Sequence, residues 1–160
     1  MHYRLSFILA SLIFFGRIGF SATLPVDIST VDVLSNGTRI SATVYMPQVD
    51  DATLKLPAIV MAHGWGGEAA HLSRYATKFA AAGFLVVAFD YRGWGTSDSR
   101  MVQVRNNAGD GYQLIEYKGV VDPIDQAEDY FSVLNWINTH PKVDINNIGL
   151  WGTSWSGGTV

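Results

Sequence analysis

One serine near the end of the 160-residue chain has the sequence context of a catalytic nucleophile. The apolar run Ile148-Gly149-Leu150-Trp151 leads into Gly152-Thr153-Ser154-Trp155-Ser156-Gly157-Gly158. A serine in a glycine-framed turn directly after a buried strand follows the pattern Gly-x-Ser-x-Gly, in which the tight turn raises the hydroxyl above the sheet. This arrangement predicts attack of an activated serine on an acyl carbon.

Two serines compete for this role. Ser154 stands two residues past Gly152, which ends the strand, but the last place of its pattern holds Ser156, and glycine follows one place later at Gly157. If Ser156 were the nucleophile, Ser154 would occupy the place of the first glycine. Because the nucleophile normally comes just past the glycine that ends the strand, the register favours Ser154.

A second glycine-rich loop matches the other requirement of acyl transfer. The segment His63-Gly64-Trp65-Gly66-Gly67 follows the apolar run of residues 57–62. The developing oxyanion needs one backbone N–H from the residue after the nucleophile and another from an earlier loop of this kind. We therefore expect the backbone N–H groups of Trp65 and Trp155 to form an oxyanion hole, where loss of one donor typically costs about 2.7–4 kcal/mol of transition-state stabilisation.

Other chemistry-bearing residues give weaker signals. His63 is predicted to make a structural hydrogen bond under its loop, while His71 and His140 are predicted on the surface beside helix ends, and His2 falls in the leader described below. Asp90 ends a strand, where catalytic groups gather, but only its position supports a catalytic role. No two histidines have the spacing for joint metal ligation, so neither a metal nor a cofactor is expected.

The candidate site residues would be positioned by strands and helices that alternate along the chain. Strand-like runs cover residues 28–34, 39–45, 57–62, 84–89 and 148–151, and helical patterns cover residues 71–82 and 122–140. Asn36-Gly37 predicts a tight hairpin turn between the first two strands. Asp122 and Pro123 have the residue types of a helix N-cap and first helical position. The strand-helix-strand order predicts parallel pairing of the later strands.

A smaller hairpin is expected from residues 101–105 and 113–117, on either side of a turn. Just before it, Gly93-Trp94-Gly95 begins like a dinucleotide-binding fingerprint, but Asp98 occupies the place of the third glycine and no helix pattern follows. The sequence therefore does not favour nucleotide binding here.

The composition excludes further classes. Hydrophobic residues make up 48% of the chain and the net charge is only -3, which is not the signature of a disordered protein. There is no basic footprint for nucleic acid. The chain has no cysteine, which excludes disulfides, thiolate metal sites and a cysteine nucleophile.

Residues 1–22 are predicted to be a secretory signal peptide. Arg4 supplies a positive charge, and the apolar run of residues 5–15 is shorter than the roughly 20 residues that a membrane helix needs. Small residues precede a predicted cleavage after Ser21 or Ala22. We expect a secreted or periplasmic mature protein without a stable membrane span, with an uncleaved N-terminal anchor as the alternative.

Together these motifs resemble the α/β-hydrolase superfamily. The matching segments are Ala62-His63-Gly64-Trp65-Gly66-Gly67, Phe89-Asp90-Tyr91-Arg92-Gly93-Trp94-Gly95-Thr96-Ser97, Val121-Asp122-Pro123 and Gly149-Leu150-Trp151-Gly152-Thr153-Ser154. They are most similar to the branch with Xaa-Pro dipeptidyl-peptidase-like and dienelactone-hydrolase-like proteins. The resemblance implies an α/β fold with a mostly parallel, eight-stranded sheet and a serine nucleophile after the fifth strand. It also implies a small-molecule or peptide acyl substrate, and Asp90 and Arg92 as partners that brace the loops.

The same resemblance implies that residues 23–160 hold only the first five strands of this domain. The acid and the base of the triad follow the serine in this fold, but only six residues follow Ser154. We therefore expect a serine hydrolase for the longer parent and no activity for this chain alone. The alternative is a non-catalytic, hydrolase-like binding or structural module.

Overall fold

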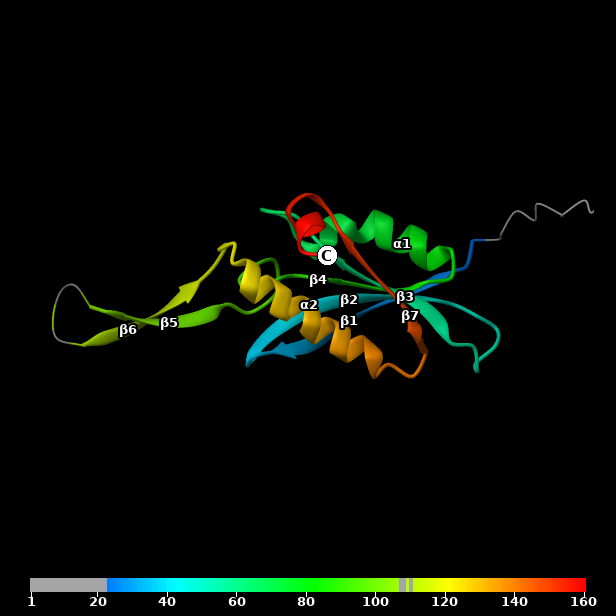
Figure 1. Cartoon of the computed structure of the whole chain (residues 1–160), viewed down its shortest axis with the longest axis horizontal. Helices are drawn as coiled ribbons and strands as arrows, with labels where there is room; N and C mark the ends of the chain where they lie inside the picture. The colour runs from blue at the N-terminus through cyan, green and yellow to red at the C-terminus, as the bar shows by residue number, and fades with distance from the viewer. Residues whose placement is uncertain (1–22, 107–108, 110) are drawn as a thin grey trace, which may run out of the picture.

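The computed structural model describes residues 23–106, 109 and 111–160, so the predicted signal peptide lies outside the described residues. The described chain has an α/β fold, with a five-stranded sheet between helices (Figure 1). Within these residues, no helix combines the length and the apolar character needed to cross a membrane.

The sheet has a mixed topology. In spatial order its strands are β1 (Val26–Ser35), β2 (Thr38–Pro47), β4 (Leu85–Phe89), β3 (Leu56–Ala62) and β7 (Val143–Gly152). The strands β1, β2 and β4 pair in antiparallel fashion, whereas β4, β3 and β7 are parallel. The carboxyl ends of these three parallel strands therefore meet at one edge, where the sequence places the two glycine-rich loops.

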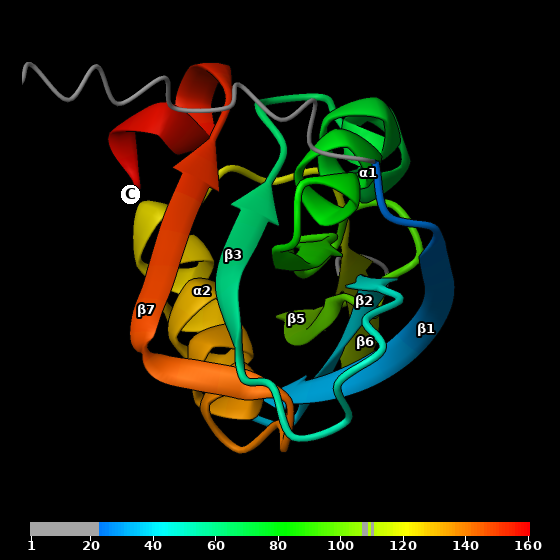
Figure 2. The same ribbon diagram turned by 90° about the vertical axis from the view of Figure 1, so that its right-hand side faces the viewer.

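Each face of the sheet is covered by one helix (Figure 2). Alternate residues of the central strands pack with Tyr130, Val133 and Ile137 of α2 (Pro123–Asn138) on one face. The residues between them pack with Ala76 and Ala80 of α1 (Ser73–Ala81) on the other. This two-sided burial explains why β3 and β4 are continuous apolar runs.

The helix ends follow their local sequence. The side chain of Asp122 accepts hydrogen bonds from the N–H groups of Ile124 (2.9 Å) and Asp125 (3.2 Å), which confirms the predicted cap of α2. The first helix differs from its prediction, because a short 3-10 turn, η1 (Ala69–Leu72), precedes α1. Gly83 has a φ of 102° and ends this helix as expected.

The last strand is longer and more exposed than the sequence predicts. β7 pairs with β3 on one side and forms an edge of the described sheet (Figure 2). Ile145 is 63% exposed and Leu150 is 41% exposed. Residues 148–151, expected as a buried strand, are therefore only partly covered in the described chain, because no described strand pairs with the outer edge of β7.

Two further strands form a hairpin outside the main sheet. β5 (Arg100–Arg105) and β6 (Tyr112–Tyr117) pair with each other and extend away from the body of the molecule (Figure 1). This confirms the small hairpin that the sequence predicts.

Candidate active site

Ser154 lies where β7 turns away from the sheet. Its φ is 54°, in the left-handed region that non-glycine residues rarely adopt. A short 3-10 helix, η2 (Ser154–Gly158), follows directly. The residue is exposed to solvent. The turn thus holds the serine in a constrained backbone conformation and presents it at the carboxyl edge of the parallel strands.

Gly152 allows this turn to close. A Cβ atom added at Gly152 would lie 2.2 Å from the backbone oxygen of Ser156 and 2.8 Å from the nitrogen of Gly157. Such distances exclude any side chain, so the first glycine of the motif is required by the close approach of the backbone.

Ser156 occupies a very different environment from Ser154. It is fully buried, and its hydroxyl donates a hydrogen bond to the carbonyl oxygen of His63. The hydroxyl of Tyr91, 2.7 Å away, then donates to the Ser156 oxygen. Burial raises the pKa of Tyr91 to about 12, so this phenol stays protonated. Of the two serines that the motif left open, Ser154 alone is accessible to a substrate.

The loop His63–Gly67 packs directly against Ser154. A Cβ atom added at Gly64 would lie 2.7 Å from the Ser154 Cβ and 3.0 Å from the carbonyl oxygen of Thr153. The next residue, Trp65, makes no backbone–backbone hydrogen bond through its N–H within the described part of the chain. The backbone donor of Trp65 is therefore uncommitted among the described residues, and the preceding residue, Gly64, lies against the serine.

Trp155 contributes from the other side. It is the second residue of η2, and the first N–H groups of a helix have no intrahelical partner. Its indole Nε1 donates to the Gln126 side-chain oxygen of α2 at 2.8 Å. The hydroxyl of Tyr130, also on α2, donates to the carbonyl oxygen of Trp151 at 2.9 Å. Helix α2 thus fixes both the strand end and the turn.

His63 lies beneath the loop and faces away from solvent. Its side chain is 2% exposed, and Nδ1 lies 2.8 Å from the carbonyl oxygen of Gly64. Because a carbonyl only accepts, Nδ1 carries the proton, and the predicted structural hydrogen bond is present. Nε2 has no hydrogen-bond partner among the described residues, and the nearest carboxylate oxygen, Asp90 Oδ1, is 4.0 Å away. Burial lowers the pKa of His63, which favours the neutral ring.

Asp90 braces two loops. Its carboxylate accepts hydrogen bonds from Ala69 N (2.6 Å), Thr96 N (2.9 Å) and Thr96 Oγ1 (3.1 Å). A Cβ atom at Gly95 would collide with this carboxylate at 2.3 Å. The carboxylate therefore has a structural position that joins the segment before α1 to the segment after β4.

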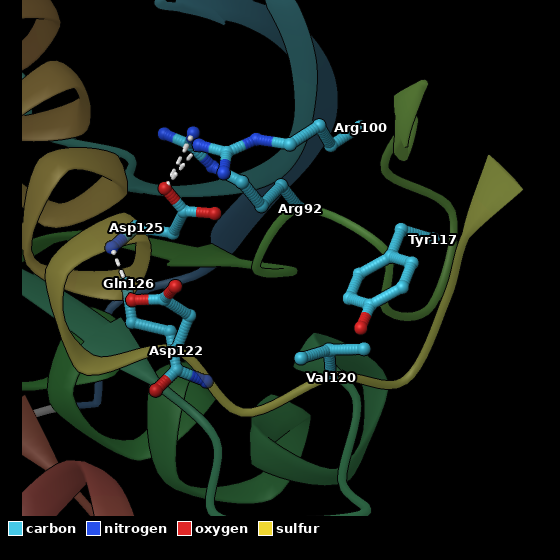
Figure 3. Close-up of a pocket in the computed structure, with 7 residues that line it drawn as sticks. All are labelled: Arg92, Arg100, Tyr117, Val120, Asp122, Asp125 and Gln126. Atoms are coloured by element: carbon cyan, nitrogen blue, oxygen red, sulfur yellow. Dashed lines mark hydrogen bonds and ion pairs between the residues drawn. The ribbon is translucent and has the colours of Figure 1, made fainter. Parts of the chain in front are cut away.

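Arg92 does not pair with Asp90, so the expectation that these two residues are partners is wrong in that respect. Arg92 instead reaches α2, where its Nη2 lies 2.7 Å from the Asp129 Oδ1 and its backbone N–H donates to Oδ2 at 2.9 Å. Asp125 is a further partner at 3.2 Å, beside a cavity of about 50 Å³ (Figure 3). The Arg92 guanidinium is therefore paired with carboxylates of α2, the helix that packs on one face of the sheet.

No described histidine forms a hydrogen bond with Ser154. His71 Nδ1 accepts from the backbone of Glu68 at 3.2 Å, and His140 lies at the end of α2 with its ring against Trp136. His140 is half-buried beside the end of α2, so it is less exposed than an open surface position. Within the described residues no group of histidine and acidic side chains could hold a metal ion.

Sequence reasoning missed the side chains that support the turn. Tyr91, Gln126 and Tyr130 each bond to it across a long stretch of chain. In the sequence, Tyr130 belongs to the apolar stripe of a helix, and Gln126 is a polar residue in the same helix. Only the fold shows that they meet residues of the serine motif.

Comparison with known proteins gives a family. The profile of the X-Pro dipeptidyl-peptidase (S15) family matches residues 36–160. The chain is 35% identical over 127 residues to the quorum-quenching protein AidA of Acinetobacter baumannii (strain MDR-ZJ06), covering 79% of this chain and 36% of that protein. It is 31% identical over 136 residues to the thiohydrolase aneE of Aspergillus aculeatus, covering 84% and 35%.

A solved structure gives the same result for the fold. The structure of DcsB in complex with its substrate analogue matches with a TM-score of 0.66 and 29% sequence identity, over 83% of this chain and 39% of that chain. The chain thus spans between about a third and two fifths of the length of these relatives. The family profile, which begins at the first hairpin turn and runs through the serine turn, shows that the chain belongs to the X-Pro dipeptidyl-peptidase (S15) family of hydrolases and has the N-terminal part of the α/β-hydrolase fold.

Proposed function

We propose that this chain carries the nucleophile and the oxyanion hole of an exported serine hydrolase. The observation that carries the proposal is the environment of Ser154, which is exposed, held at a positive φ and packed against the Gly64 loop. A serine held this way at the carboxyl edge of a parallel sheet fits the nucleophile position of an acyl-transfer enzyme.

In the proposed reaction, the Ser154 hydroxyl attacks the acyl carbon of an ester, thioester or amide. The carbonyl oxygen becomes a tetrahedral oxyanion, which accepts hydrogen bonds from the backbone N–H groups of Trp65 and Trp155. The bond to the leaving group breaks to give an acyl-enzyme, and water then releases the acid and regenerates Ser154. The names of the relatives, a thiohydrolase and a peptidase family, support this range of acyl substrates.

The general base and its acid partner are proposed to lie in a segment of the gene product after Val160. Two observations support this. No described histidine is bonded to Ser154, and the relatives are longer than this chain by more than a factor of two. We expect residues 23–160 alone to be inactive for this reason. The apolar run before Ala22 supports export of the mature protein.

A fluorophosphonate probe, which acylating serines attack, tests this proposal in the full-length gene product. Ser154→Ala should abolish labelling, because the attacking oxygen is gone. Ser156→Ala should retain most labelling, although it leaves the Tyr91 hydroxyl and the His63 carbonyl without their partner at a cost of about 1–3 kcal/mol. Circular dichroism of both variants separates loss of fold from loss of the nucleophile. Labelling that survives Ser154→Ala and disappears in Ser156→Ala would transfer the role to Ser156.

The second candidate is a non-catalytic module that keeps this fold for binding. It is favoured by one observation, that the base of a triad is missing beside Ser154 within the described residues. The same labelling experiment separates the two candidates. A folded full-length product that no fluorophosphonate labels would support the binding module and reject the hydrolase.

A further inference from the structure

The β5–β6 hairpin is the least covered element of the described chain. Its strands pair with each other in a sheet of their own, and the ribbon extends away from the main sheet (Figure 1). Even so, it carries large exposed hydrophobic side chains. A two-stranded hairpin in water is at best marginally stable by itself. An exposed apolar ribbon of this kind indicates a surface that meets another molecule.

The base of the hairpin is held firmly. A Cβ atom at Gly93 would lie 2.9 Å from the carbonyl oxygen of Tyr117, so the loop after β4 touches the end of β6. The Gly119 N–H donates to the Gly93 carbonyl oxygen at 2.9 Å, and Trp94 Nε1 donates to the Val120 oxygen at 3.1 Å. These contacts fit a fixed docking arm better than a hinged lid.

The register of the hairpin defines two faces. Arg100 and Tyr117 are paired and line the small cavity against α2, where Arg100 also forms an ion pair with Asp125 (Figure 3). At the base of the hairpin, the face that carries Arg100 and Tyr117 is therefore turned toward the main sheet and α2. The opposite face, called the outer face below, consists of Met101, Gln103, Arg105, Tyr112, Leu114 and Glu116.

The outer face has an exposed apolar side chain at each of its three paired positions and opposite charges at its two ends: Met101 is paired with Glu116, Leu114 with Gln103, and Tyr112 with Arg105. Met101, Leu114 and Tyr112 are 56%, 66% and 69% exposed. Arg105 lies at the turn end and has no ion pair among the described residues, whereas Glu116 lies at the base end. Glu116 has an exposed partner, Lys118, but exposed pairs of this kind contribute little and can exchange.

This charge pattern is complementary to itself. If two outer faces stack with their strands in opposite directions, the turn end of each copy meets the base end of the other, so that Arg105 of each copy comes near Glu116 of the other on both sides of Leu114. Stacking in the same direction would instead bring like charges together. A two-fold axis through the middle of the ribbon generates the first arrangement, and such axes are the commonest symmetry of protein dimers.

We propose that the outer face binds a second copy of this chain, with the two-fold axis close to Leu114. The contact buries the three exposed apolar side chains and pairs both charges. Because the stacked ribbons run in opposite directions, the base of each hairpin lies at the turn end of the other, and the body of the second copy lies beyond that turn end. The proposal does not depend on the function proposed for Ser154, and Ser154→Ala should leave the dimer unchanged.

Cross-linking of the full-length product tests the proposed axis, with the product that carries no introduced cysteine as the background, since residues 1–160 contribute no thiol of their own. Leu114→Cys is placed at the axis, where two thiols of a dimer come within disulfide reach. Gln113→Cys is the matched control, because Gln113 is the adjacent residue, is also exposed and lies on the other face. Oxidation of dilute protein should join the Leu114→Cys chains and leave the Gln113→Cys chains as monomers. Equal cross-linking of both variants, or cross-linking of neither, overturns the proposal.

Charge reversal provides a second test that does not need a disulfide. Arg105→Glu and Glu116→Arg should each weaken the dimer several-fold in analytical ultracentrifugation, because each places like charges together across the interface. The two changes combined in one chain should restore the dimer, since the charge pattern is again complementary. A combined variant no better than the single variants would overturn the proposed stacking, as would a monomeric full-length product.

Discussion

Replacement of Gly64 by alanine should slow the reaction of Ser154 without unfolding the protein. The added methyl group would lie 2.7 Å from the Ser154 Cβ, whereas ordinary contacts begin at 3.4 Å, so the two groups must separate by at least about 0.7 Å. A displacement of about 1 Å at a reacting group can cost about 10²-fold in rate. Crowding of this kind typically destabilises a packed region by about 1–3 kcal/mol. We therefore expect labelling by a fluorophosphonate to slow by between ten- and a hundredfold.

The rate of labelling is measured on the full-length gene product at several probe concentrations, with thermal unfolding measured in parallel. Gly158→Ala is the matched control, because it lies in η2 beside Ser154 and an added Cβ there meets nothing within 4 Å. The control should label at the unmodified rate. A Gly64→Ala protein that also labels at this rate would refute the close packing of the loop against the serine as the basis of reactivity.

Three further predictions concern export, the isolated chain and a buried ion pair. Mature protein from the native host should begin at or just after Ala22, and membrane-bound protein that still starts at the initiator methionine would contradict export. Residues 23–160 expressed alone should be poorly soluble and inactive on short p-nitrophenyl esters, because β7 leaves an apolar strand edge open; a soluble monomer with a cooperative melt and serine-dependent turnover would show otherwise. Arg92→Ala leaves Asp129 buried without its partner and should cost about 3–5 kcal/mol in denaturant unfolding of the full-length product, far more than Arg39→Ala at an exposed pair; equal losses would contradict this.

Local signals in the sequence were sufficient for most of the fold. The turn at Asn36-Gly37, the cap at Asp122 and the stop at Gly83 each act within a few residues, so their effect can be predicted without knowledge of the rest of the chain. β7 shows the limit. Its first half includes Asn146 and Asn147, which give no apolar pattern, and its length is set by pairing with β3.

The motifs of the candidate site could be predicted from the sequence, but the side chains that hold the serine turn and the neighbouring loops in place could not. The register favoured Ser154, and the structure adds that Ser156 is buried and bonded. The Arg92–Asp129 pair joins residues 37 positions apart, and such a contact has no periodic trace in a single sequence. The resemblance to the α/β-hydrolase superfamily implied Asp90 as the partner of Arg92, whereas the arginine bonds to Asp129 on α2.

The buried hydroxyl of Ser156 has a consequence for how this motif can vary. In the pattern Gly-x-Ser-x-Gly the fifth residue has no side chain, whereas here its oxygen joins the Tyr91 hydroxyl to the His63 carbonyl and so links three separate segments. Loss of the Ser156 hydroxyl alone leaves both the Tyr91 hydroxyl and the His63 carbonyl without this partner, whereas loss of both hydroxyls leaves only the carbonyl without it. Serine at position 156 and tyrosine at position 91 should therefore occur together among members of the family. Members with glycine in the fifth place of the motif should more often have phenylalanine at the position of Tyr91.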